Sequence, residues 1–463
     1  MTQNTDLLQE ALAGWHSLAS FRKGRKRNID YTFGRQWNDI VVKEGREMSE
    51  FDHLMREGYQ PLKNNLIRRV VRNVNGVFRR KLSEKMRQWN PLLLSIAEEN
   101  SLYELYSRQM EEFLISGMVV VRKSFERRNG MPGVVTTVVS PSSFFCNPSA
   151  SDIRGWDLDL VGCFHDVSFR QWCSEFVKTR ADYRRACETF LAGRPKVRVM
   201  EVWKREMRPR ILVQDPLSGS LLKFDAGRSL NIPSRGRSKW FLDDVWRYYF
   251  LDSEGKVLAE GDSPYVHGSH PFVLKRYPLM EGEVHSLVSD IIDQQRFTNR
   301  LITLYDSAIR SSAKGVLLIP EGSFKDDCYQ EAVDVWGRHD GVIIYQSKPD
   351  IPEPKQVTGD LSNLGINQLL EIQLKMLEDV SGVNGVLQGS LSHNSTSGTL
   401  FTQQTENAMT SLSDIIDTFF AFIDDCNRVD LSLAAQIRGQ SETDVKMDPY
   451  WHNETQNGAS DDK

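Results

Sequence analysis

Two long segments in the second half of the chain carry apolar residues at helical spacing. Residues 286–314 place these on one stripe, whereas the middle of the segment is polar. A helix buried within one core is apolar through its middle, so this pattern favours a partly solvated helix flanked by copies of itself. A second helix is predicted over residues 360–380. The stripe comprises Leu287, Ile291, Ile302, Tyr305 and Ile309, and the polar middle Gln294, Gln295, Arg296, Thr298, Asn299 and Arg300.

The segment between these helices, residues 315–356, has a pattern of its own. We expect a strand over 316–319, a short helix over 325–336 and a second strand over 341–345. A piece of about 40 residues cannot bury a full core alone. It is therefore expected to complete its core against neighbouring chains.

A polar loop containing glycines follows the second helix, over residues 384–398. A further long helix is predicted over residues 400–437, with its apolar positions facing broadly one way. Beyond it, the last residues are polar and acidic, a composition typical of a disordered tail.

The first half of the chain mixes helical and alternating patterns. We predict an α+β fold with an antiparallel sheet, in which Trp203, Trp240 and Trp246 pack as strand residues rather than form a stacking platform. Turns are expected at 130–133, Pro209 and 253–255. The predicted helices span residues 6–26, 62–87, 97–117 and 169–191, and the predicted strands span 118–122, 134–139, 197–206, 210–213, 245–251 and 256–260.

Basic residues are concentrated near the N-terminus. The run Arg22-Lys-Gly-Arg-Lys-Arg27 is compatible with nucleic-acid contact, but is more often a solvated or subunit-facing patch. The helix over 62–87 carries many Arg and Lys around an apolar stripe, so it requires acidic partners or solvent. From residue 284 onward, 13 basic residues face 27 acidic ones, whereas the whole chain has a net charge of only -4. This division indicates two surfaces with different partners, or simply exposed acidic helices.

Composition excludes several classes of protein. With 463 residues, 40% of them hydrophobic and 26% charged, the chain is a globular protein of two or three domains. It has no long apolar run and no signal-peptide pattern, so we expect a cytoplasmic protein that does not enter a membrane. The six cysteines include no C-x-x-C pair, which favours reduced thiols over disulfides or a zinc site: Cys146, Cys163, Cys173, Cys187, Cys328 and Cys426.

Catalytic motifs are missing from the sequence. It has no phosphate-binding loop, dinucleotide fingerprint, nucleophile elbow or H-E-x-x-H. The pair His267 and His270 is interpreted as a turn before a strand rather than as metal ligands. Asp326-Asp327 and Asp424-Asp425 are interpreted as solvated faces, because adjacent helical side chains diverge by about 100°. We therefore predict no catalytic residues, no metal and no cofactor.

Several motifs, in order along the chain, resemble those of the portal proteins of tailed bacteriophages, the head-to-tail connectors. Each is weak alone, and their order and spacing carry the resemblance. They are Tyr31-x-x-Gly34-x-Gln36-Trp37, NLIRRVV at 65–71, FLISGMVVVR at 113–122, VSPSSFFCNP at 139–148, HPFV at 270–273, Gly282, IIDQQ at 291–295, and Asn299-Arg300.

The resemblance implies a portal-like α+β architecture and a dodecameric ring at one capsid vertex, through which double-stranded DNA is packaged and ejected. It implies contacts with the major capsid protein, the terminase motor and a head-tail adaptor, and a place in the virion after assembly in the host cytoplasm. Because the chain ends soon after the last helix, an extended crown is in doubt. The implied parts are a wing (1–281), stem helices (282–314 and 358–382), a clip (315–357), a tunnel loop (383–398), a crown-side helix (399–438) and a polar tail (439–463).

Three groups of residues are candidates for function within this scheme. Gln295, Arg296, Asn299 and Arg300 are expected to face neighbouring subunits along the stem. Phe324, Tyr329 and Trp336 of the clip are expected to contact the motor and the adaptor, or else to pack between subunits. The tunnel loop would touch DNA weakly and transiently, or else serve as a plain helix connector; its candidates are Gln388, His393, Asn394 and Ser395.

A channel that passes any DNA sequence should not bind phosphates tightly, so we expect an acidic lining, supplied mainly by the neighbours of the first long helix. Two other interpretations stay open. One is a phage packaging ATPase or nuclease, which the missing motifs oppose. The other is a virion adaptor protein that is not a portal.

Overall fold

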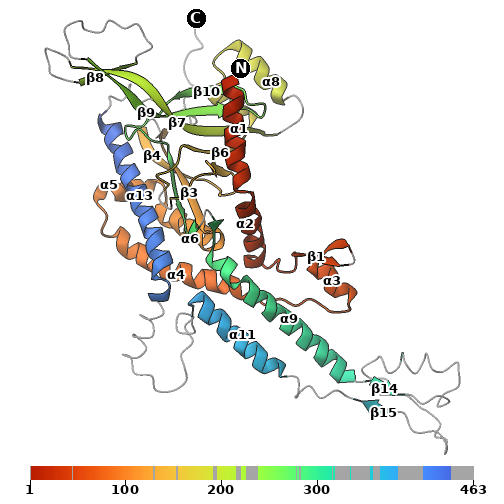
Figure 1. Ribbon diagram of the computed structural model, residues 1–463. Helices are drawn as coiled ribbons and strands as arrows, with labels where there is room; N and C mark the ends of the chain where they lie inside the picture. The colour runs from red at the N-terminus through yellow and green to blue at the C-terminus, as the bar shows by residue number, and fades with distance from the viewer. Residues whose placement is uncertain are drawn as a thin grey trace, which may run out of the picture. The chain divides into compact units, whose positions relative to one another are not determined.

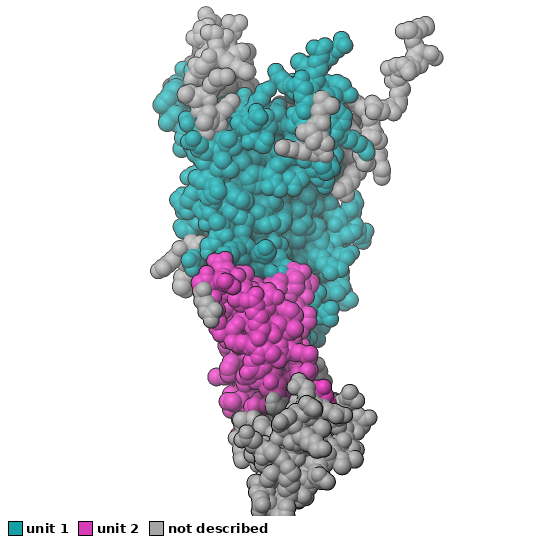
Figure 2. Space-filling model, turned by 90° about the vertical axis from the view of Figure 1, so that its right-hand side faces the viewer, with its two compact units in different colours: residues 1–32, 67–291, 381–463 teal, residues 33–66, 292–380 magenta. Residues whose placement is uncertain are grey.

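The computed structural model describes residues 2–43, 45–128, 131–152, 155–190, 195–214, 221–225, 238–277, 279–280, 283–314, 316–318, 334, 355–357, 365–383 and 410–439. It divides into two compact units (Figure 2). Unit 1 comprises residues 1–32, 67–291 and 381–463, and unit 2 comprises residues 33–66 and 292–380. These units do not test the predicted wing, stem and clip, which stay predictions.

The N-terminal part of unit 1 is helical. The helix expected over 6–26 is in fact two, α1 (Thr2–Ser17) and α2 (Ala19–Thr32). The basic helix, α4 (Leu66–Met86), buries Val70, Val74 and Phe78 of the predicted stripe. The helix expected over 97–117 is divided into α5 (Pro91–Glu99) and α6 (Leu102–Ser116), because the backbone of Ser101 takes a left-handed conformation with φ of 50°.

Gly117 ends α6 as the sequence predicted. Its φ is 74°, a left-handed conformation that glycine adopts without steric cost. A Cβ at this position would lie 2.0 Å from the carbonyl oxygen of His285, so the close approach of the two segments also requires glycine. The chain then enters strand β3 directly.

Two antiparallel sheets form the body of unit 1 (Figure 1). The smaller has the order β11-β3-β4, and the larger the order β10-β9-β7-β6-β5, with β8 also paired to β7. The core cluster between them includes Phe125, Phe144 and Trp203. Their bounds are β3 Met118–Arg128, β4 Met131–Val138, β5 Phe144–Cys146, β6 Leu160–Val167, β7 Val197–Gln214, β8 Leu221–Asp225, β9 Ser238–Leu251, β10 Val257–Asp262 and β11 Phe272–Arg276; β12 (Leu279–Met280) and β13 (Glu283–Val284) pair separately.

Strand β7 corrects one expectation. The sequence suggested two strands with a turn at Pro209, but β7 is continuous and Pro209 lies opposite Leu242 of β9. Proline removes a single ladder donor, and the pairs on both sides keep the register. Of the three tryptophans, Trp203 and Trp246 are buried as expected, whereas Trp240 is exposed.

The helix expected over 169–191 is also two helices. Ser168 caps the first, α7 (Phe169–Phe176), with a capping box. The second, α8 (Arg180–Phe190), begins where the hydroxyl of Thr179 accepts a hydrogen bond from the amide of Asp182 at 3.2 Å. A second N-terminal cap within the apolar pattern therefore divides the segment.

The last described helix of unit 1 is α13 (Ser413–Gly439), which contacts β3, β4 and β11 (Figure 1). Its buried positions include Ile416, Phe419 and Ile423, as predicted. Phe419 contacts Phe78 of α4 and Phe113 of α6 at ring-centroid distances of 5.0 and 5.5 Å. Residues 401–409 and the polar tail 440–463 lie outside the described residues.

Unit 2 contains the two long helices of the sequence pattern. Helix α9 (Leu287–Lys314), most of which belongs to this unit, and α11 (Ile366–Ser381) correspond to the predicted pair. Strand β14 (Val316–Leu318) confirms the first strand of the insertion, but its partner is β15 (Lys355–Val357), which was not predicted. Apart from residue 334, which is helical, the expected helix 325–336 lies outside the described residues, as do the expected strand 341–345 and loop 384–398. The unit also includes β1 (Ile40–Lys43), β2 (Arg46–Ser49) and α3 (Glu50–Arg56).

Candidate functional site

The polar middle of α9 binds the main chain of residues 62–66. Gln295, Asn299 and Thr303 follow one another at intervals of four, so they share one face of the helix. The Gln295 Nε2 donates to the Asn64 carbonyl at 2.5 Å, and its Oε1 accepts from the Leu66 amide at 2.9 Å. Asn299 Oδ1 accepts from the Asn64 amide at 3.1 Å, and Thr303 Oγ1 accepts from the Leu62 amide at 3.0 Å. Three helical side chains thus bond to main-chain groups of the segment that leads into α4, a segment that pairs with no strand in the described part of the chain.

The face of α9 that makes this contact is buried, whereas Asp293 and Arg300 of the same stretch are exposed. Gln295, Thr298 and Asn299 are at most 1% exposed. Asn299 Nδ2 also donates to Gln36 Oε1 at 2.6 Å, and Gln295 Nε2 to Asn299 Oδ1 at 2.9 Å. Buried amides require such partners, and here they come from the same chain.

Arg296 and Arg300 both bind Glu50. Arg296 Nε lies 3.1 Å from Glu50 Oε2, and Arg300 Nε lies 2.9 Å from Oε1. The Glu50 carboxylate, buried at the start of α3, therefore carries one guanidinium on each oxygen. The structure thus brings together all four predicted stem residues, but around residues 36–66 of their own chain. A single chain does not test their intersubunit role, which stays a prediction.

Helix α11 exposes an apolar stripe. Leu369, Ile372, Met376 and Val380 occupy positions i, i+3, i+7 and i+11, which lie on one side of a helix, and are 46–54% exposed. Phe297, Leu304 and Ile309 of α9 are also 43–46% exposed. Contiguous exposed apolar side chains of this size mark interaction surfaces. We call the four residues of α11 the α11 stripe.

The basic residues of the N-terminal part have partners within unit 1. The guanidinium of Arg22 lies 3.7 Å from the ring centroid of Trp15. Arg25 forms two hydrogen bonds with the carboxylate of Glu112, at 2.7 and 2.9 Å. Arg68 of α4 is paired with Glu111. These contacts use Arg22, Arg25 and Arg68 inside the chain, which opposes a nucleic-acid surface at these residues. The expectation of a solvated or subunit-facing patch is not tested by a single chain.

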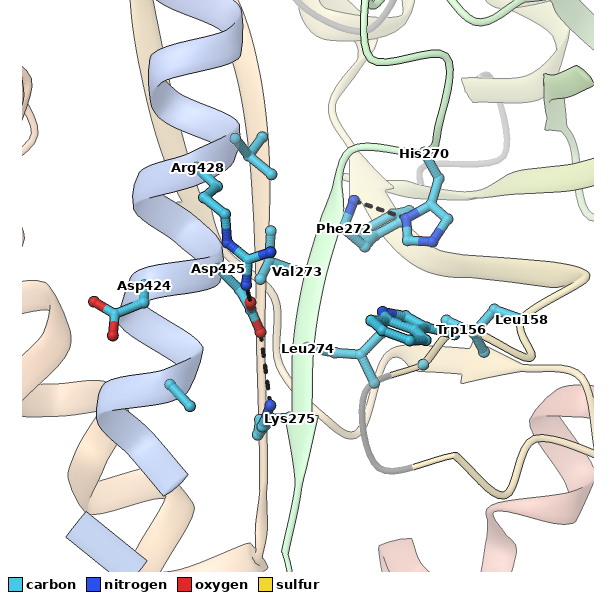
Figure 3. Close-up of a pocket in the computed structure, with 13 residues that line it drawn as sticks. Trp156, Leu158, His270, Phe272, Val273, Leu274, Lys275, Asp424, Asp425 and Arg428 are labelled. Atoms are coloured by element: carbon cyan, nitrogen blue, oxygen red, sulfur yellow. Dashed lines mark hydrogen bonds and ion pairs between the residues drawn. The ribbon is translucent and has the colours of Figure 1, made fainter. Parts of the chain in front are cut away.

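A pocket of about 470 Å³ opens in unit 1 between β11, α13 and the loop around Trp156 (Figure 3). Its lining mixes apolar and charged side chains, and Trp156 is 70% exposed. On α13, Asp425 is ion-paired with Lys275 at 3.6 Å and with Arg428, as Figure 3 shows. The lining residues are Gly155, Trp156, Leu158, His270, Phe272, Val273, Leu274, Lys275, Ala421, Asp424, Asp425, Arg428 and Val429.

His270, which lines the pocket, and His267 of the preceding turn are structural. His270 Nδ1 accepts from the Phe272 amide at 3.3 Å, and His267 Nδ1 accepts from the Ser269 amide at 3.1 Å. Burial lowers the pKa of His270 to about 3 and that of His267 to about 4, so both rings are neutral acceptors. The turn interpretation of this segment is confirmed by Gly268, whose φ is 66°. The lining residues do not combine a nucleophile with a base.

The remaining candidates lie outside the described residues. They are Gln388, His393, Asn394 and Ser395 of the predicted tunnel loop, and Phe324, Tyr329 and Trp336 of the predicted clip. The aspartate pair Asp326-Asp327 also lies outside the described residues. Asp424 and Asp425 are on α13, where they pair with Lys85 and Lys275 respectively.

The α+β fold thus carries long helices with exposed apolar faces, and Lys275, Asp425 and Arg428 at the pocket are ion-paired. The sequence model of the phage P22-like portal proteins matches residues 89–440. The chain belongs to this family of tailed-phage portal proteins, so it is a structural component of the virion, which associates with capsid and head or tail proteins. The predicted resemblance is confirmed, and the interpretation as a packaging enzyme or a non-portal adaptor is wrong.

A solved structure described as "Virion of native gene transfer agent (GTA) particle" aligns with 86% of this chain and 87% of its own. The identity is 12% and the TM-score 0.33. No curated protein matches the sequence. In the described part of the chain, no helix has both the length and the apolar character needed to span a bilayer.

Proposed function

We propose that copies of this chain form a ring, dodecameric as in the family resemblance, at one vertex of the capsid. Double-stranded DNA passes through the ring during packaging and again during ejection. The observation that carries the ring is the α11 stripe, because a monomeric protein rarely leaves such a continuous apolar helix face in water. Membership of the portal family supports the same conclusion.

The α11 stripe is proposed to pack against the neighbouring subunit. Each large apolar side chain that becomes fully buried contributes about 1.5–3 kcal/mol, and the contribution is repeated at every interface of a closed ring. Of the four predicted stem residues, Arg296 and Arg300 have side chains that are 29% and 46% exposed, so a neighbour can reach them. Gln295 and Asn299 act indirectly, by fixing α9 in its own chain.

The channel is proposed to be acidic. From residue 284 onward, 27 acidic residues outnumber 13 basic ones, a balance that limits phosphate binding and lets DNA slide. The tunnel-loop candidates Gln388, His393, Asn394 and Ser395 are neutral or weakly basic, which suits brief contact with DNA. Assembly is proposed to take place in the host cytoplasm, where the ring meets the major capsid protein.

Exposed aromatic side chains are common anchors of protein interfaces. We propose that Phe324, Tyr329 and Trp336 of the clip bind first the terminase and then the head-tail adaptor. Their sequence separation of five to seven residues places them on one short segment.

Charge placed on the α11 stripe tests the ring. The double variant Ile372→Glu, Met376→Glu puts two carboxylates into the proposed interface, whereas the control Glu371→Gln, Lys375→Gln changes exposed polar positions of the same helix. We expect wild-type protein and control to give rings with a central hole in negative-stain images, and the double variant to give monomers in mass photometry. Intact rings from the folded double variant would show that the α11 stripe is not part of the interface. Monomers from wild-type protein would contradict the proposed ring.

A further inference from the structure

Three side chains of different chemistry meet on one face of the larger sheet of unit 1. Cys163 and His165 are two residues apart on β6, so their side chains point to the same face. The register of β6 and β7 places Glu201 directly opposite Cys163. In the described part of the chain, this is the group of Cys, His, Asp and Glu side chains compact enough to hold a metal ion.

The three donor atoms converge on one point. His165 Nε2 lies 3.1 Å from Cys163 Sγ and 2.7 Å from Glu201 Oε2, and Sγ lies 3.8 Å from Oε2. A catalytic relay would use the two different ring nitrogens of the histidine, one for the nucleophile and one for the carboxylate. Here the thiol and the carboxylate both approach Nε2. Ligands of a tetrahedral zinc ion lie about 3.5 Å apart, given its bond lengths of about 2.0–2.3 Å, so small shifts would admit an ion.

The carboxylate is held in position from its other side. Glu201 Oε1 accepts from Arg122 Nε at 3.1 Å and from Trp203 Nε1 at 2.8 Å. These donors leave Oε2 directed at His165 and Cys163. Ligating carboxylates in metal sites are commonly oriented by hydrogen bonds of this kind. The Arg122 guanidinium also offsets part of the negative charge that a thiolate and a carboxylate would place in the core.

Access to the cluster is one-sided. The Glu201 side chain is fully buried and Cys163 is 1% exposed, whereas the side chain of His165 is 18% exposed. An ion and a water ligand can therefore enter past the imidazole. Sulfur, nitrogen and oxygen donors together suit zinc better than magnesium or calcium, which prefer oxygen alone.

We propose that Cys163, His165 and Glu201 bind a divalent transition-metal ion of the zinc type, with water as the fourth ligand. The ion would tie β6 to β7 through side chains, in addition to the ladder of main-chain hydrogen bonds. This site is independent of the ring and of DNA passage. The spacing of the cysteines along the sequence does not indicate this metal site.

Zinc content of the full-length chain tests the site. The protein is produced with zinc in the medium, passed over a chelating resin, and analysed for metal after denaturation. We expect about one equivalent per chain, and a loss of more than tenfold in zinc affinity in Cys163→Ser and in His165→Gln. Cys146→Ser, which alters another buried thiol on the neighbouring β5, should bind zinc as wild type does.

Cobalt gives a second measurement. Cobalt(II) added to the metal-free wild-type chain should produce the visible bands of a tetrahedral ion and a thiolate charge-transfer band, which Cys163→Ser should lack. The His165 side chain is partly exposed, so His165→Gln decides the outcome if Cys163→Ser fails to fold. Wild-type protein without zinc, or zinc affinity unchanged in folded His165→Gln, would overturn the proposal.

Discussion

The buried side chain of Gln295 holds α9 against residues 62–66 through several hydrogen bonds. Its amide group is fully used: Oε1 accepts from Leu66, and Nε2 donates to Asn64 and to Asn299. Two of these partners are main-chain groups of residues 62–66, which no strand pairs in the described part of the chain. The position of α9 against residues 62–66 therefore depends on a few amides rather than on apolar packing alone.

Replacement of Gln295 by leucine is predicted to loosen this contact. The variant keeps a similar volume but loses the bonds to the Leu66 amide and the Asn64 carbonyl, which then keep only their mutual hydrogen bond of 2.9 Å. Two lost hydrogen bonds cost about 1–3 kcal/mol in the free energy of unfolding. Denaturant unfolding measures the loss, and hydrogen exchange of the amides of residues 62–66 should accelerate. Arg310→Gln on the same helix breaks an exposed ion pair with Asp306 and should cost less than about 0.5 kcal/mol. Equal stability of the two variants would contradict this account.

The sequence selected some of these residues but not their partners. Polarity in the middle of an otherwise amphipathic helix drew attention to Gln295, Arg296, Asn299 and Arg300. Their partners lie more than 220 residues earlier in the chain, at separations such as 231 and 250. Periodicity reports only on neighbours in sequence, so it could not choose between a neighbouring subunit and the same chain. Cys163 was interpreted only as a reduced thiol for the same reason, because Glu201, its neighbour in space, lies on another strand.

At the scale of elements, the junction of α6 and β3 makes a sharp prediction. Gly117→Ala forces a left-handed alanine, which costs about 1–2 kcal/mol, and drives its Cβ against the carbonyl of His285. We expect unit 1 to lose at least about 2 kcal/mol of stability, measured as a lower unfolding midpoint in urea.

Gly76 provides the matched control. It lies within α4, and a Cβ there would meet open space. Gly76→Ala should stabilise the protein by about 0.5–1 kcal/mol, because alanine loses less conformational entropy in a helix. The two glycine variants should therefore change the free energy of unfolding in opposite directions. A destabilising Gly76→Ala or a harmless Gly117→Ala would refute the explanation.

The elements that the sequence predicted well are those with clear periodicity and a clear end. Helix α4 and the C-terminus of α6 at Gly117 were both anticipated. Predictions were wrong where a local sequence pattern was overruled by strand pairing or by a helix cap. Pro209 suggested a turn inside β7, and the cap at Thr179 was not recognised inside an apolar pattern. Tertiary pairing decided the first case and a short polar motif the second.

The whole molecule was identified through the order of its motifs, since no single motif was specific. That order predicted the portal family, which the match over residues 89–440 confirms. The division into two units could not be predicted, because residues 33–66 join unit 2 although unit 1 precedes and follows them in sequence. A hydrophobic pattern predicts the buried face of a single helix or strand, but it does not predict which elements share a core.

Deletion of residues 390–397 tests the tunnel loop at this scale. The ring should assemble as in wild type, since the α11 stripe is unchanged, but packaging or retention of DNA should be impaired. Particles produced by complementation with the variant would be assayed for nuclease-protected DNA. Normal packaging by the deletion would assign these residues to a plain helix connector. Replacement of the segment by a glycine-serine linker of equal length controls for the shortened chain.

The contact between α9 and residues 62–66 also has an evolutionary consequence. Gln295, Asn299 and Thr303 bond to amides and a carbonyl of Leu62, Asn64 and Leu66, atoms that almost every amino acid possesses. The identities of those three residues can therefore drift without loss of these bonds, whereas the helical side chains cannot. Among relatives, positions 62, 64 and 66 should therefore vary more than positions 295, 299 and 303.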